Sequence, residues 1–279
     1  MAEISAAAVK ALREKTQLPM MECKRALLET DGDQDAAIDL LRKQGKKTME
    51  SRSGRETAFG RLAVCADVKT GVGAMIELCC ESATVAGHEE FVQLAKDLAA
   101  QLAKGPGAAT PEELLAQPSP SKPDQTLDHQ KEDLFNRMRE VLNLRRIVRI
   151  DGPCGGYAHH TGSPGVLVEV SGGDQQIANE ISMHVAAMRP AVVHREDLDP
   201  AMVEKEREIL MEISRKEGKP ENIIEKMVEG RMRNFYAERV LTEQPFIKDE
   251  KGKKTVGKIA EAAGMKILRL IYWELGKEA

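Results

Sequence analysis

Apolar residues recur at helical spacing near the start of the chain and predict three short helices. Ser5 can cap the first helix, Pro19 suits the first turn of the second, and Asp33 can cap the third. We expect Gly45 to end the third helix. A core built from about 45 residues is marginal on its own, and a module of this size usually binds a partner.

Beyond this module the apolar pattern changes from helical to alternating. The polar stretch at residues 46–55 predicts a tether. Alternating apolar residues at 62–68 predict a strand, and the more apolar run at 74–80 predicts a second strand after a tight turn. Helices are then predicted where apolar residues recur at 91–102 and at 127–142, with a Gly- and Pro-rich loop between them.

The next segment repeats this order of elements. It has strands at residues 147–150 and 165–170 and then a helix at 174–188, which Pro190 stops. The sequences GAMIEL at 73–78 and GVLVEV at 165–170 both read glycine, three apolar residues, glutamate and an apolar residue. Both precede a predicted helix. We therefore predict an α+β fold with two similar subdomains, each built on an antiparallel sheet.

Two further helices are predicted at about residues 198–236, with a break at Gly218, Lys219 and Pro220. Their apolar seams indicate an antiparallel coiled-coil arm, which is more often a docking surface than a catalytic element. The seam residues are Met202, Val203, Ile209, Leu210, Ile213, Ile223, Ile224, Met227, Val228, Met232 and Phe235. The predicted domains are 1–50 (helical), 51–58 (linker), 59–150 (first subdomain) and 151–279 (second subdomain with the arm).

Composition narrows the classes of function. The 41 basic and 45 acidic residues give a net charge of −4, which argues against a general nucleic-acid binder. No apolar run reaches the roughly 18–20 residues of a membrane span. Residues 1–5 show neither the basic start nor the apolar stretch of a secretory signal. The five scattered cysteines lack disulfide or metal spacing, so we expect a cytoplasmic protein without direct nucleic-acid or membrane contacts.

Phosphate-binding motifs are weak in this sequence. GKKT at residues 252–255 matches the end of a phosphate-binding loop, but Ile247 stands where the first glycine of that loop is required. Gly71 and Gly73 suggest the start of a dinucleotide fingerprint, but Ile76 replaces its third glycine and the turn opens a strand. We therefore predict no cofactor.

Thiol and metal chemistry are equally poorly supported. Cys79, Cys80 and His88 suggest a thiol nucleophile with a base, but neighbouring strand residues point to opposite faces. His159 and His160, with His184 or His194, suggest metal ligands, yet no Cys or carboxylate stands at ligand spacing. We predict no catalytic set and no metal, while a thiol or metal enzyme stays an alternative.

Eight segments stand in one order across nearly the whole chain: VKALREKT (9–16), MMECKRAL (20–27), ELCCES (77–82), NLRR (143–146), MHVAA (183–187), EKMVEGRM (225–232), LTEQPF (241–246) and KTVG (254–257). Together these segments resemble the elongation factor Ts family. The resemblance implies a ubiquitin-associated-like N-terminal domain, a duplicated core and a coiled-coil arm. It also implies guanine-nucleotide exchange on the GTPase elongation factor Tu, without covalent chemistry.

The resemblance further implies which residues contact the GTPase. Arg13, Met20 and Met21 of the N-terminal module would contact its nucleotide-binding domain. For the two methionines the alternative is packing in the core, although neighbouring helical positions differ by about 100° and both can hardly point inward. His159 and His160 lie in a loop that resembles a further family contact site.

Three departures from the family pattern bear on activity. The family segment Thr-Asp-Phe-Val, which disturbs Mg²⁺ binding in the GTPase, falls on Ser82, Ala83, Thr84 and Val85. A methyl group and a small hydroxyl replace the carboxylate and the aromatic wedge, so exchange would depend more on other contacts. Arg139 stands where the family usually has glycine in a contact segment. The sequence also stops shortly after residues 269–276, whereas many relatives continue into another partner-binding helix, so we expect that contact to be lost.

Two questions stay open at this point. The chain is either an exchange factor or an interaction protein that binds elongation factor Tu without accelerating GDP release. The coiled-coil arm either pairs two copies in a homodimer or packs on the partner, since both uses present an apolar stripe.

Overall fold

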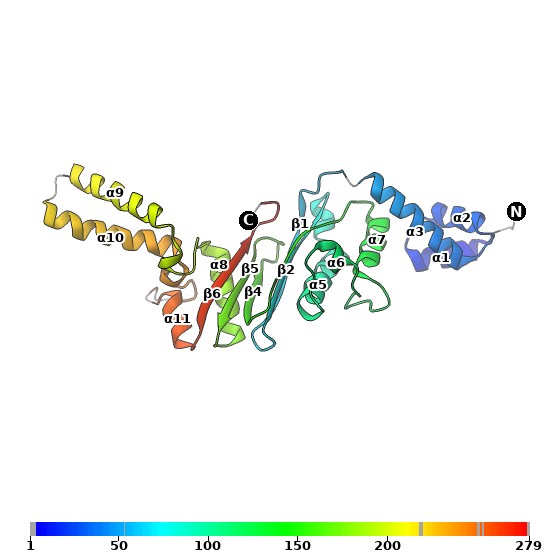
Figure 1. Ribbon diagram of the computed structural model, residues 1–279. Coiled ribbons are helices and arrows are strands. Elements are labelled where there is room, and N and C mark those ends of the chain that lie inside the picture. The colour runs from blue at the N-terminus through cyan, green and yellow to red at the C-terminus, as the bar shows by residue number, and fades with distance from the viewer. Residues whose placement is uncertain (1–3, 53, 218–219, 250–251, 253, 278–279) are drawn as a thin grey trace. The chain divides into compact units, whose positions relative to one another are not determined.

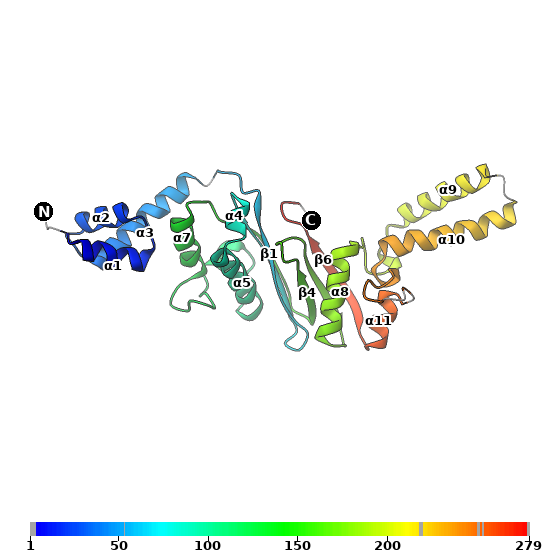
Figure 2. The same cartoon turned by 180° about the vertical axis from the view of Figure 1, so that it is seen from behind.

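A computed structural model describes residues 4–52, 54–217, 220–249, 252 and 254–277 (Figures 1 and 2). The chain divides into a first unit, Met1–Ala63 with Ile76–Val148, and a second unit, Val64–Met75 with Arg149–Ala279. In chain order the elements are α1 (Ala6–Thr16), α2 (Met20–Glu29), α3 (Gln34–Ser51), β1 (Phe59–Asp67), β2 (Val72–Cys80), α4 (Ala83–Ala86), α5 (Glu89–Lys104), α6 (Pro111–Leu115), α7 (Leu127–Met138), β3 (Asn143–Ile150), β4 (Cys154–Ala158), β5 (Gly165–Ser171), α8 (Gln175–Met188), η1 (Arg195–Asp197), α9 (Pro200–Lys216), α10 (Glu221–Arg239), η2 (Leu241–Glu243), α11 (Val256–Ala262) and β6 (Lys266–Trp273).

Helices α1, α2 and α3 form an N-terminal module, as the apolar spacing predicts (Figure 1). The Ser5 hydroxyl caps α1 by accepting a hydrogen bond from the Ala8 N–H at 3.2 Å. The Asp33 carboxylate caps α3 by accepting from the N–H groups of Asp35 and Ala36 at 2.9 and 3.0 Å. The small aliphatic core of the module consists of Val9, Leu12, Leu18, Cys23, Ala26, Leu27, Ala37 and Leu41.

Helix α3 is longer than the sequence indicated, and the prediction that Gly45 ends it is wrong. The helix continues to Ser51, so residues 46–51 of the predicted tether are helical. A Cβ atom at Gly45 would lie 1.9 Å from the Asn136 side-chain oxygen. The glycine therefore permits close approach of α3 to α7 and does not serve as a C-cap.

The first sheet has the strand order β1-β2-β3. A short turn joins β1 to β2, so these two strands run antiparallel, and every residue of β2 is buried. Helices α4 to α7 lie between β2 and β3 in the chain. The predicted apolar stripe of α5 is confirmed, because its large apolar residues Phe91, Leu94, Leu98 and Leu102 are fully buried.

Two details of this sheet's helices differ from the sequence prediction. Helix α6 occupies part of the predicted loop, where Thr110 caps it and Pro111 takes its first position. Helix α7 ends at Met138, because Arg139 adopts a left-handed conformation with φ of 61°. Leu142 therefore lies beyond the helix, in the approach to β3.

The second sheet has the strand order β4-β5-β6, and both pairings are antiparallel. Strand β4 was not predicted, because its glycines and short length hide the alternation. The order of elements nevertheless matches that of the first sheet: a hairpin, then helices, then a third strand beside the second. The prediction of an α+β fold with antiparallel sheets is confirmed, whereas the strand predicted at residues 147–150 as part of the second repeat belongs to β3 of the first sheet. The core of the second unit is formed by Val166, Val168, Val170, Ala178, Ile181, Val185, Val193, Leu241, Phe246, Val256, Ala260, Met265 and Ile267.

Helices α9 and α10 lie side by side in the second unit (Figures 1 and 2). The predicted seam is correct for Ile224, Val228, Met232 and Phe235 of α10, which are buried, and wrong for Ile223, which is 44% exposed. It is wrong in part for α9, since Met202, Ile209 and Ile213 remain 42–48% exposed. The predicted seam residues Val203 and Leu210 do pack toward α10, together with the buried Ser214, which was not predicted. Gly218 and Lys219 of the predicted break lie outside the described residues.

In the described part of the chain, no helix combines the length and the apolar composition that a bilayer crossing needs.

Candidate partner-binding site

Helix α2 presents two large apolar side chains to solvent. Met20 is 50% exposed and Met21 is 66% exposed, whereas Cys23 and Leu27 on the same helix are fully buried. The alternative of core packing therefore fails for both methionines in the unbound chain. Arg13 on α1 is also exposed. A methionine is flexible and polarizable, so an exposed pair suits adaptable contact with another protein.

Residues 82–85 form the N-cap and most of the short helix α4. Ser82 is the N-cap, and its hydroxyl accepts from the Val85 N–H at 3.3 Å. Ala83 and Thr84 are exposed, while Val85 is 7% exposed and anchors the turn. Only the middle two residues thus offer side chains to a partner without a local rearrangement.

Glu140 holds this segment in place, although nothing in the sequence singled it out. Its two carboxylate oxygens accept from the Ser82 backbone N–H at 3.0 Å and from the Ser82 hydroxyl at 2.7 Å. The neighbouring Glu81 accepts from the Val141 N–H at 2.8 Å and pairs with Arg55 at 3.0 Å. The hydrogen bond from Val141, more than the charge of Arg55, lowers the pKa of Glu81.

A buried ion cluster joins the two sequence motifs ELCCES and NLRR. Glu77 on β2 is fully buried, and its carboxylate oxygens lie 3.2 Å from Arg145 and 2.5 Å from Arg146 on β3. Arg145 also donates to the Thr57 carbonyl at 3.2 Å. A buried charge is tolerated only with such partners. The cluster therefore fixes the strand that leads directly into residues 82–85.

The two adjacent cysteines do not provide a nucleophile. Burial raises the pKa of the Cys79 thiol to about 12 and that of Cys80 to about 11. Their hydrogen-bond acceptors are different, namely the Glu77 carboxylate for Cys79 and the Ser82 carbonyl for Cys80. Both thiols stay protonated at neutral pH, which argues against the thiol-enzyme alternative.

His159 and His160 belong to the second unit, in the loop after β4. Their ring centroids lie 4.2 Å apart, and Nδ1 of His159 lies 2.7 Å from the Thr161 hydroxyl. The His159 N–H donates to the Pro164 carbonyl at 2.9 Å, which closes the loop. His160 is exposed and His159 half-buried, so His160 is the more available of the two to a partner.

The histidines proposed as alternative metal ligands have structural hydrogen bonds. His184 is fully buried; its Nδ1 accepts from the Ile247 N–H at 3.3 Å, so Nε2 donates to the Gln244 side-chain oxygen at 2.9 Å. Burial lowers the pKa of His184. His194 Nε2 lies 3.0 Å from the Ile267 carbonyl. In the described part of the chain no cluster of three or more His, Cys, Asp or Glu side chains has an arrangement that suits a metal.

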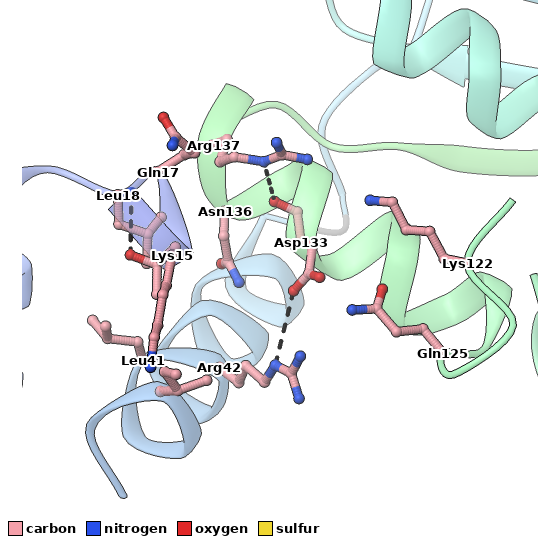
Figure 3. A pocket seen from close by; sticks show the side chains of 12 residues that line it. Lys15, Gln17, Leu18, Leu41, Arg42, Lys122, Gln125, Asp133, Asn136 and Arg137 are labelled. Atoms are coloured by element: carbon pink, nitrogen blue, oxygen red, sulfur yellow. Dashed lines mark hydrogen bonds and ion pairs between the residues drawn. The ribbon is translucent and has the colours of Figure 1, made fainter. Parts of the chain in front are cut away.

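A cavity of about 320 Å³ lies between the N-terminal module and α7 (Figure 3). Figure 3 shows the Asp133 carboxylate pointing toward Arg42, and their charged atoms are 3.8 Å apart. Leu18 and Leu41 line the module side, and Arg137 lines the α7 side. The module and α7 therefore pack closely at Gly45 and Asn136 and leave a cavity with polar and apolar walls beside that contact.

The family model described as "Elongation factor TS" matches residues 82–277. Elongation factor Ts of Methylococcus capsulatus is 40% identical over 277 residues, which cover 98% of this chain and 92% of that protein. The protein of the same name from Alkalilimnicola ehrlichii is 41% identical over 276 residues, with the same coverage. That from Pasteurella multocida is 39% identical over 277 residues, covering 99% of this chain and 93% of its own. With a family match over most of the chain and this similarity along nearly its full length, the chain belongs to the elongation factor Ts family of translation elongation factors.

Proposed function

We propose that this protein is a guanine-nucleotide exchange factor that binds elongation factor Tu in its GDP form and promotes GDP release. The exposure of Met20 and Met21 on α2 is the observation that carries the proposal, because apolar side chains of this size gain most when a partner covers them. Arg13 adds a cationic contact on the same module. Membership of the family supports the identity of the partner.

An exchange factor of this kind works by differential binding. It binds the GTPase more tightly when the phosphate and Mg²⁺ site is distorted, so it weakens GDP binding, and GDP weakens its own binding by the same factor. A thousandfold faster release requires a barrier lower by about 4 kcal/mol, which a few contacts can supply. GTP then rebinds, and the factor needs no catalytic group or cofactor.

The segment at residues 82–85 favours a second function, namely binding of elongation factor Tu with weak or no exchange. Ala83 and Thr84 are the exposed residues of that segment, and neither has a carboxylate or an aromatic ring that could displace Mg²⁺ or separate helices. In the exchange proposal the segment still docks, while the N-terminal module and the loop with His159 and His160 contribute the remaining distortion.

Homodimer formation through the α9–α10 arm stays a prediction. The apolar side chains Met202, Ile209 and Ile213 of α9 are partly exposed, and they would be covered either by a second copy or by the GTPase. Sedimentation of the chain with and without elongation factor Tu separates these outcomes. A dimer that forms in the absence of the GTPase can only be a homodimer.

The release of a fluorescent GDP analogue from elongation factor Tu tests the proposed function. We expect addition of the chain at micromolar concentration to accelerate release. Complex formation without acceleration would support the second function, and the absence of both would reject the two together.

A further inference from the structure

Arg139 has a backbone conformation that a side chain makes costly. It caps α7 with φ of 61° and ψ of 22°, and its N–H donates to the Phe135 carbonyl at 2.7 Å. Glycine is the residue that adopts this left-handed conformation without penalty. The backbone cost of an arginine at this position directs attention to the contacts of its side chain.

Both the side chain and the backbone carbonyl of Arg139 contact the N-terminal module. Its guanidinium forms an ion pair with the Glu22 carboxylate on α2, next to the exposed Met21. Its carbonyl accepts a hydrogen bond from the Arg52 guanidinium at 2.8 Å, directly after α3. One residue at the end of α7 thus contacts two segments of the module.

The next residue along the chain contacts the other proposed docking segment. Glu140 accepts from the N–H and the hydroxyl of Ser82 at 3.0 and 2.7 Å, as described above. Arg139 and Glu140 are consecutive, so the same stretch of backbone is connected to Glu22 on one side and to Ser82 on the other. The two surfaces proposed to contact the GTPase in the first unit are thereby connected through two residues.

The remaining contact between the module and α7 includes two further ion pairs and a cavity. It contains the ion pairs Arg42–Asp133 at 3.8 Å and Lys46–Glu132 at 3.6 Å, and the cavity of Figure 3 lies within it. Polar contacts between modules of one chain commonly permit relative motion. The Glu22–Arg139 pair adds to these ion pairs and connects α2 with the end of α7.

We propose that Arg139 is a positioning residue: through Glu22 and the adjacent Glu140 it holds Met20 and Met21 at a fixed distance from residues 82–85. Both surfaces then reach elongation factor Tu together, and the ordering cost of the second contact is reduced. This inference rests on the proposed function for its effect on exchange. The fixed distance itself is a property of the chain alone.

The test follows the placement of the module through the distance between spin labels at the exposed ends of α2 and α5. The labels are attached to cysteines introduced at Glu29 and Lys104, in a chain with Cys65 replaced by serine. We expect Glu22→Gln and Arg139→Gly each to broaden the distance distribution, and the charge swap of Glu22→Arg with Arg139→Glu to narrow it again. Arg139→Gly is the decisive variant, because it removes the left-handed side chain and should leave the melting temperature unchanged or higher. Broadening in that variant cannot then be attributed to misfolding.

The second readout is the concentration of factor that gives half-maximal GDP release. We expect it to rise about twofold to fivefold in the single variants, as for the loss of a partly exposed ion pair, and to return in the swap. Glu14→Gln, which removes the exposed Lys10–Glu14 pair within α1, is the matched control and should alter neither readout.

The proposal is overturned if the single variants leave the distance distribution unchanged. It is also overturned if the distribution broadens while the half-maximal concentration of factor stays the same, or if the charge swap restores neither the distribution nor that concentration. If the wild-type chain releases no GDP, the proposed function fails, whereas the distance measurement still decides whether Arg139 fixes the module.

Discussion

Replacement of Met21 by alanine tests the proposed contact of α2 with the GTPase most directly. Burying a whole methionine side chain is worth about 1.5–3 kcal/mol. Because Met21 is 66% exposed, a partner that covers it gains about two thirds of this, or roughly 1–2 kcal/mol. We expect Met21→Ala to weaken binding of elongation factor Tu about 5- to 30-fold.

The same substitution should leave the chain folded. The Met21 side chain contributes little to the core of the module, and alanine favours a helix, so the free energy of unfolding should change by less than about 0.5 kcal/mol. Isothermal titration calorimetry gives the affinity, and urea unfolding followed by circular dichroism gives the stability. A drop in affinity with unchanged stability assigns the loss to the interface.

Leu28→Ala provides the matched control on the same helix. Leu28 is 43% exposed and is not among the residues proposed to contact the GTPase, so its replacement should leave the affinity within about twofold. Equal losses for Met21→Ala and Leu28→Ala would show that α2 responds to any apolar truncation. An unchanged affinity for Met21→Ala would refute the assignment of α2 to the interface.

Three further outcomes follow from the structure. Glu77→Gln should destabilise the chain by about 3 kcal/mol in urea unfolding, because Arg145 and Arg146 then lack their buried counter-charge, and a loss below 1 kcal/mol would contradict that role. Burial lowers the pKa of His184 in the folded chain, so below the ordinary pKa of 6.5 the unfolded chain binds a proton at His184 more readily than the folded chain does. The free energy of unfolding should therefore fall as the pH drops from 7.5 to 5.5. A His184→Gln variant should lack that part of the decrease. The double change of Ala83→Asp with Thr84→Phe, at two exposed positions, should leave stability within about 0.5 kcal/mol and accelerate GDP release at saturating factor. No gain in release would count against a role of this segment in Mg²⁺ displacement.

Local signals in the sequence predicted most of the helices and the repeated order of elements. Caps such as Ser5 and Asp33 act within a few residues, so the sequence reveals them directly. Gly45 misled the prediction because the reason for the glycine is Asn136, a residue far along the chain. The prediction for α9 was wrong in part for a related reason. The spacing of apolar residues shows that a helix has an apolar face, but it does not show which residues of that face meet α10.

The sequence likewise indicated only part of the proposed site, and the fold was needed for the rest. Arg13, Met20, Met21 and residues 82–85 could be indicated by a family resemblance, but their exposure could not. Glu140 carried no sequence signal, since a lone glutamate after a helix is ordinary; only the fold brings it to Ser82. Arg139 could be singled out as unusual, while its contact with Glu22 depends on how the module packs on α7.

The placement of the α9–α10 arm has a consequence for how the chain is made. Strand β6 pairs with β5, yet residues 172–265, which include the arm, separate the two strands. A nascent chain emerging from the ribosome therefore carries β5, with its buried valines Val166, Val168 and Val170, while one hydrogen-bonding edge of that strand is still open. Long-range pairing of this kind is slow to form, and the second sheet is completed only after the arm has been synthesised.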